Sequence, residues 1–177
     1  GGCIAIPDGA DLLDLRRMRF VGCSSDGDGG AIDAFAATQT TIQNSTFTGN
    51  SAGAQAGAVN CWNFGALTVE DSTFSGNAAG VTNGTGSAGA IQASFVDLVL
   101  RRSTLSDNSA RGSAGALSIS GISTSTIESS TIVGNSAGLS TTTGAGGGVM
   151  LMSQTETTFV NTVVAGNVDL STTGASA

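Results

Sequence analysis

The chain contains no histidine and no tyrosine, and only one of its 177 residues is proline. Histidine is the commonest general base and metal ligand at neutral pH, so its absence removes the usual centre of both kinds of site. Six basic residues stand against 13 acidic ones, which gives a net charge of −7. Such a chain lacks the basic surface that binds nucleic acid or an anionic membrane.

Long hydrophobic runs are also missing, since no apolar stretch approaches the roughly 20 residues that span a bilayer. We therefore expect no nucleic-acid partner, no membrane insertion of this chain and no cofactor. The chain also begins without a methionine or a signal peptide, and we interpret it as a processed or partial segment.

Glycine, by contrast, is abundant at 27 residues, and one short segment recurs six times along the chain. Its versions read RMRFVGC, NSTFTGN, DSTFSGN, RSTLSDN, SSTIVGN and NTVVAGN. The central apolar residue returns every 27 to 32 residues, at Phe20, Phe47, Phe74, Leu105, Ile132 and Val164. A period of this size is typical of repeat architectures, in which each unit buries its apolar face against its neighbours.

Further apolar columns align with this repeat. One lies five residues before the central residue, at Leu15, Ile42, Val69, Leu100, Ile127 and Phe159. Between the two columns the alternation slips by one residue, which indicates a bend between two strands near Asn44, Asp71, Arg102, Ser129 and Asn161. A third strand follows the recurring glycines, with inward residues at Ile32, Val59, Ile91, Leu117 and Val149 and then at Ala34, Cys61, Ala93, Ile119 and Leu151.

An asparagine closes most versions of the repeat, at Asn50, Asn77, Asn108, Asn135 and Asn167. Asparagine tolerates the left-handed backbone of a tight corner, and stacked amides can hydrogen-bond along a column. We expect an ordered ladder at this corner; the alternative is a row of solvent-exposed turn residues.

Together these patterns predict an all-β fold, a right-handed parallel β-helix of about six turns with three strands per turn. We expect residues 1–177 to form a single β-solenoid domain, as a segment of a longer or self-stacking protein.

The pairing of GGA[ILV] with FxxN resembles the repeat of chlamydial-type polymorphic outer-membrane proteins. Segments such as LTVEDSTFSGN and NTVVAGN are similar to bacterial surface proteins of the choice-of-anchor Q kind. The resemblance covers nearly the whole chain, although Cys23 replaces the first corner asparagine. It implies a passenger, stalk or adhesin on a cell surface, with a host surface or a glycan as partner.

From the repeat and this resemblance we predict a non-catalytic scaffold, extracellular or on the cell surface, that is adhesive or fibre-forming. Open solenoid ends present unpaired strand edges and core side chains, so we also expect head-to-tail self-association or coverage by flanking domains.

An alternative is a carbohydrate-active enzyme similar to polysaccharide lyases. Acids and arginines fall at equivalent outward positions of successive repeats, at Glu70, Asp71, Arg101, Arg102 and Glu128. Carboxylates that hold a cation or a proton, beside arginines near the substrate, would suit such chemistry. An exposed ladder of cross-strand ion pairs explains the same pattern without any activity.

Other candidate sites are smaller. A calcium site could form from Asp26, Asp28 and Asp33 in the glycine-rich segment SSDGDGGAID, although solvated turn acids explain it as well. Cys61 falls in an inward column and is interpreted as a buried thiol. A disulfide between Cys3 and Cys23 would suit an oxidising compartment, but the spacing does not establish it.

Two links between the corner asparagine and the third strand carry five extra residues, on alternate turns. Both must project from one edge, where loops on a rigid scaffold commonly bind partners. The candidate binding residues in them are Val81, Thr82, Asn83, Thr85, Leu139, Thr141, Thr142 and Thr143. A last hypothesis is a surface- or ice-binding file of outward threonines at Thr46, Thr73, Thr104 and Thr131.

Overall fold

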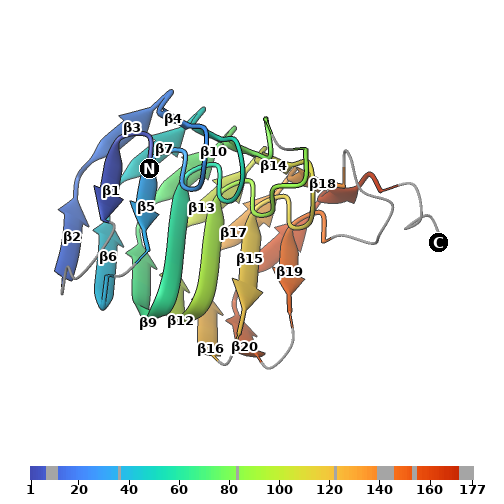
Figure 1. Ribbon diagram of the computed structural model, residues 1–177. Coiled ribbons are helices and arrows are strands. Elements are labelled where there is room, and N and C mark those ends of the chain that lie inside the picture. The colour runs from blue at the N-terminus through green and yellow to red at the C-terminus, as the bar shows by residue number, and fades with distance from the viewer. Residues whose placement is uncertain are drawn as a thin grey trace.

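The computed structural model describes residues 1–6, 12–35, 37–82, 84–121, 123–138, 146–152 and 155–171, with the side chains of residues 63 and 64 excepted. These residues form three parallel sheets wound into a β-solenoid, and none of them is helical. Figure 1 shows the strands of successive turns side by side, from β2 near the N-terminus to β20 near the C-terminus. The predicted parallel β-helix is confirmed. No helix in the described ranges could cross a membrane.

The largest sheet has ten strands. They are β1 (Ile4–Ile6), β2 (Leu12–Arg16), β5 (Ile32–Ala34), β6 (Gln39–Gln43), β9 (Val59–Glu70), β12 (Ile91–Arg101), β15 (Leu117–Ser120), β16 (Ser123–Glu128), β19 (Val149–Leu151) and β20 (Thr155–Val160). In β9 and β12 one continuous strand includes two segments that the sequence had suggested as separate strands. The chain there runs on in one sheet, with a bulge in the pairing between Ser94 and Val96.

The second sheet has six short strands, one for each predicted repeat. They are β3 (Arg19–Val21), β7 (Thr46–Thr48), β10 (Thr73–Ser75), β13 (Thr104–Ser106), β17 (Thr131–Val133) and β21 (Val163–Ala165). Their central residues pair in register, so that Phe74 lies between Phe47 and Leu105. The rings of Phe47 and Phe74 stack with centroids 4.5 Å apart.

The third sheet lies directly after the corner and has six two-residue strands. They are β4 (Ser24–Ser25), β8 (Ser51–Ala52), β11 (Ala78–Ala79), β14 (Ser109–Ala110), β18 (Ser136–Ala137) and β22 (Val168–Asp169). The sequence analysis did not separate these strands from the links that follow. In the four middle strands of this sheet the second residue is a buried alanine.

The predicted columns form the core. Ile42, Val69, Leu100 and Ile127 are fully buried, as are Ile32, Val59, Ile91 and Leu117. In the last turn the equivalent residues Leu151, Phe159 and Val164 are more than two-fifths exposed. These three residues are more exposed than the other members of their columns, because no further turn stacks on the last one among the described residues.

The corner asparagines form the expected ladder, and the alternative of exposed turn residues is wrong. Asn77 and Asn108 are completely buried, and the Nδ2 of Asn77 donates to the Oδ1 of Asn108 at 2.8 Å. The left-handed backbone, however, belongs to the preceding residue, as at Gly49 and Gly76 with φ near 62°. Glycine adopts that conformation without steric cost, and so the amide is free to turn inward.

The predicted bend between the first two sheets is also present. A positive φ between 46° and 50° is found at each of the five predicted positions, Asn44, Asp71, Arg102, Ser129 and Asn161. A second ladder follows at once, because the Oγ atoms of Ser72, Ser103 and Ser130 accept hydrogen bonds from the peptide N–H of the equivalent residue one turn earlier.

Candidate functional site

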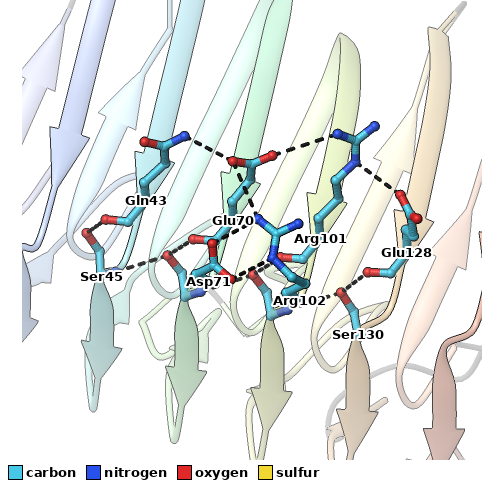
Figure 2. A network of polar contacts seen from close by, with 10 residues as sticks. Gln43, Ser45, Glu70, Asp71, Arg101, Arg102, Glu128 and Ser130 are labelled. Atoms are coloured by element: carbon cyan, nitrogen blue, oxygen red, sulfur yellow. Dashed lines mark hydrogen bonds and ion pairs between the residues drawn. The ribbon is translucent and has the colours of Figure 1, made fainter.

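The charged residues singled out in the sequence lie together on one face of the large sheet, at the ends of its strands. Glu70 ends β9, Arg101 ends β12 and Glu128 ends β16, and the three are register partners across the sheet. Figure 2 shows Arg101 between the two glutamates. Its Nη1 lies 3.8 Å from Glu70 Oε1, and its Nε lies 3.2 Å from Glu128 Oε2, an ion pair without hydrogen-bond geometry.

The second arginine lies one residue later, at the bend. Arg102 donates through Nε and Nη2 to the two carboxylate oxygens of Asp71, at 2.7 and 2.9 Å. This two-point hydrogen bond lowers the pKa of Asp71 below its usual range and raises the pKa of Arg102. The left-handed backbone at both residues aims the two side chains at each other.

Glu70 is the centre of this network, because it also accepts a hydrogen bond from Gln43 Nε2 at 3.0 Å. Each arginine therefore has a carboxylate from a neighbouring turn, and each carboxylate is occupied (Figure 2). The structure thus brings together all five predicted residues. A ladder of alternating charge stabilises the register of stacked turns. A substrate anion at Arg102 would have to displace the two hydrogen bonds to Asp71, and one at Arg101 would lie between two glutamates.

The aspartates of the glycine-rich segment do not assemble into a metal site. Asp28 Oδ1 accepts a hydrogen bond from the Gln55 peptide N–H, and Asp33 Oδ1 accepts one from Asn60 Nδ2. Within the described ranges no group of three or more potential metal-ligating side chains is close enough to hold an ion. Asp26, the third candidate, therefore does not complete a three-ligand group with the other two.

Two of the three cysteines form a disulfide, and the third is a free thiol. Cys3 and Cys23 are joined by a disulfide, the possibility that their spacing had left open. Cys61 is buried and free, and burial raises the pKa of its thiol to about 12. A thiol with that pKa stays protonated at neutral pH, so Cys61 is a core residue and not a nucleophile.

The projecting loops are only partly within the described residues. Val81, Thr82 and Thr85 are exposed, and Gly84 N–H donates to the Gly80 carbonyl, which makes a tight turn there. The remaining candidates, Asn83, Leu139, Thr141, Thr142 and Thr143, lie outside the described residues.

The outward threonines form the expected file. Thr46, Thr73, Thr104 and Thr131 pair in register across the second sheet. Beside them runs a second outward file that the sequence analysis did not include, consisting of Thr48, Ser75, Ser106 and Val133. The hydroxyl array is therefore two residues wide over most of its length.

A pocket of about 310 Å³ opens on the outer face of the large sheet, away from every residue singled out in the sequence except Asp28. Strands β9, β12 and β15 provide most of its lining, with Asp28 and Gln55 contributed by the corner links. The strand residues are Asn60, Trp62, Gln92, Ser94, Phe95 and Ser120. A usable signal was present in the sequence: large aromatic residues interrupt the outward positions of strands whose other outward residues are small or polar.

No family model, curated protein or solved structure matches this chain.

Proposed function

We propose that this protein is a non-catalytic, extracellular β-helix scaffold that presents a binding surface, as an adhesin-like or fibre-forming surface protein. The observation that carries the proposal is the state of the two outward arginines. Arg101 lies between Glu70 and Glu128, and Arg102 is bound at two points by Asp71. In this cluster of acids and arginines, whose composition would suit an active site, each arginine is thus already paired with carboxylates of the protein itself.

Two other features support the proposed setting. The Cys3–Cys23 disulfide suits an oxidising compartment such as the cell exterior. A continuous buried core with two ladders of side-chain hydrogen bonds makes a rigid support, on which exposed loops and pockets keep fixed positions. The resemblance of the GGA[ILV] and FxxN segments to bacterial surface proteins points to the same role.

The enzyme alternative predicts a measurable product. We expect incubation with oligogalacturonate, with and without Ca²⁺, to give neither unsaturated product nor new reducing ends. Arg101→Ala and Arg102→Ala serve as matched variants. Product formation that both substitutions abolish would overturn the scaffold proposal and assign the charged face to catalysis.

The two-file hydroxyl array supports a second candidate, a surface that binds an ordered lattice such as ice. The array is regular because parallel strands repeat at about 4.8 Å. Thermal hysteresis of a solution of the protein tests this candidate. Hysteresis that Thr73→Lys abolishes, at unchanged melting temperature, would place the function on the second sheet.

A further inference from the structure

The pocket on the large sheet contains a buried hydrogen-bond acceptor with nothing to accept from. Asn60 is 2% exposed, and its Nδ2 donates to Asp33 Oδ1 at 2.9 Å. Because an ionised carboxylate can only accept, this contact fixes the orientation of the amide. Asn60 Oδ1 then has no hydrogen-bond partner among the described residues. A buried polar atom left in this state is costly, and a ligand that donates a hydrogen bond would satisfy it.

A second amide lines the same pocket in the adjacent strand. Gln92 is the register partner of Asn60, and its Oε1 likewise has no partner within the described residues. Its Nε2 donates to Ser94 Oγ at 3.2 Å, and Ser94 Oγ lies 2.8 Å from Ser120 Oγ. The floor of the pocket is therefore a row of amide and hydroxyl groups, held by contacts between the turns.

An aromatic wall stands beside this polar floor. Trp62 is 43% exposed, and Phe35 packs edge-on against its indole, with ring centroids 5.1 Å apart. The perpendicular contact holds the indole in place and leaves part of it open to the pocket. Phe95 lines the pocket from the next turn and is also more than a third exposed.

The backbone at Phe95 is strained, and its side chain lines the pocket instead of packing in the core. Phe95 has a φ of 55°, which is unfavourable for a large side chain. It lies opposite the bulge, because β12 has this one residue between Ser94 and Val96 where β9 has two residues between Trp62 and Gly65. At this irregularity the Phe95 ring lies against Gly121, and a Cβ atom added to Gly121 would be 2.6 Å from the ring, so only glycine leaves room for it there. Bulges of this kind re-aim side chains at binding sites.

The charge of the pocket limits the class of ligand that it can bind. Among the described residues that line the pocket Asp28 alone is charged, and Asp28 Oδ1 already accepts a hydrogen bond from the Gln55 peptide N–H. Without a cation the pocket offers nothing to a phosphate or a uronic acid. The two unpaired acceptors, Asn60 Oδ1 and Gln92 Oε1, favour a ligand rich in hydroxyl donors, and the exposed part of the indole favours contact with the C–H groups of a sugar ring.

We propose that this pocket binds a neutral mono- or disaccharide unit with mainly equatorial hydroxyls, such as a β-linked glucose or N-acetylglucosamine unit. The volume of about 310 Å³ fits a ligand of that size, at the lower end of small-molecule pockets. The inference deepens the proposed scaffold role, because it names the class of ligand that the scaffold presents a site for.

Trp62 is the only tryptophan of the chain, so its fluorescence reports directly on the pocket. We would titrate the protein with cellobiose and with N,N′-diacetylchitobiose at up to millimolar concentrations, beside digalacturonic acid and choline. A saturable change with at least one neutral disaccharide, and none with the acidic sugar or with choline, is the expected result. No change with either neutral disaccharide, or a larger change with choline, would overturn the proposal.

Variants separate binding from folding. Gln92→Ala removes one acceptor and should weaken binding by about tenfold, whereas Gln39→Ala, an exposed glutamine on the same sheet, should leave it unchanged. Phe95→Gly relieves the left-handed strain, so its melting temperature should stay equal or rise while affinity falls. Equal affinity of the wild type, Gln92→Ala and Phe95→Gly would overturn the assignment of the pocket.

Different results would overturn the sugar-binding proposal and the scaffold proposal. Sugar binding without any new reducing ends supports both proposals. Release of reducing ends from the bound disaccharide would keep the ligand class and overturn the non-catalytic role. A protein that neither binds nor cleaves a neutral disaccharide would lose only the ligand assignment.

Discussion

Asn108 shows how one side chain can join three turns of the coil. Its Oδ1 accepts from the peptide N–H and from the Nδ2 of Asn77, at 3.0 and 2.8 Å. Its own Nδ2 donates to Asn135 Oδ1 at 2.9 Å and to the Phe74 carbonyl at 3.1 Å. The fully buried Asn108 amide thus forms hydrogen bonds with backbone groups of two neighbouring residues, Asn77 and Phe74, near a corner where regular strand pairing is interrupted.

Replacing Asn108 by alanine should therefore be costly. The change removes the acceptor of the Asn77 peptide N–H and of one Asn77 Nδ2 hydrogen, at about 1–3 kcal/mol for each buried group left unsatisfied, and it removes a donor to the Phe74 carbonyl. We expect a loss of at least about 2 kcal/mol in the free energy of unfolding, measured by urea denaturation. Thr104→Ala, in the outward file of the neighbouring strand, is the control and should cost less than about 1 kcal/mol. Equal losses would show that the ladder does not stabilise the corner.

Cys61 gives a second prediction at this scale. Its pKa is raised from 9.0 to about 12 because burial disfavours the thiolate. The unfolded chain ionises first, so the stabilisation from the buried thiol is complete below pH 9 and is lost as pH rises from 9.0 towards 12. At pH 8 a thiol reagent should label the folded protein far more slowly than the protein in denaturant. Equal labelling rates would mean that this column is open to solvent.

At the scale of the strand, apolar periodicity was enough to predict which residues point inward. The columns at Ile42, Val69 and Leu100 could be read because stacking repeats one environment in every turn, and each column is buried. The backbone at the corners was harder. The asparagines were expected to take the left-handed conformation, but the residue before each of them takes it, a glycine in most turns and Asp107 before Asn108.

Side-chain partners were harder to predict than strands. The serine ladder was missed because Ser72 and Ser103 look like ordinary turn residues until the turns are stacked. The charged face was predicted as a cluster, whereas its pairing depends on where the bend aims Arg102. The pocket was missed because its residues lie at outward positions, which in a β-helix usually face water, so the aromatic residues there were not interpreted as a site. The bulge opposite Phe95, which helps to shape the pocket, could not be located from the apolar pattern.

The Asp71–Arg102 pair leads to a prediction on pH. Its hydrogen bonds lower the pKa of Asp71 below 3.8. The stabilisation is therefore complete above pH 3.8 and is lost as pH falls through the lowered value. Arg102→Gln should melt slightly below the wild type at pH 7, and the difference should vanish at the lowest pH at which both still fold. Both residues are exposed, so the effect at pH 7 should be smaller than that of Asn108→Ala.

At the scale of the whole molecule, the two ends of the described coil differ. In the first turn Leu15 and Phe20 are 7% and 6% exposed, and the Cys3–Cys23 disulfide lies beside them. In the last turn Phe159 and Val164, which continue the same two columns, are 42% and 51% exposed. Among the described residues, strands β1 to β4 and strands β19 to β22 alike have a strand partner on one side only, so the two ends differ in the burial of their core columns and not in strand pairing. Figure 1 places β19 and β20 at the end of the coil opposite β2.

The difference between the ends bears on the fibre-forming alternative. A filament requires two different ends that bind each other, so that every copy contacts two neighbours. If only one end of the coil associates, two copies pair through that end and assembly stops at a dimer. Cys23 also occupies the position where the asparagine ladder would continue, and as a half-cystine it offers no amide to a preceding turn. We therefore expect the 177-residue chain to associate through its last turn and to stop at a dimer.

Sedimentation velocity at micromolar concentration measures this directly. Val164→Lys places a charge in the exposed column and should give a monomer, because burying an unpaired charge in a contact is unfavourable. Thr158→Lys adds the same charge to an outward position of the same turn and should leave the dimer intact. A wild-type filament would show that the disulfide-linked first turn accepts a partner after all. A wild-type monomer would show that the apolar last turn does not associate, and adhesion by a single copy would then be the form of the scaffold to test.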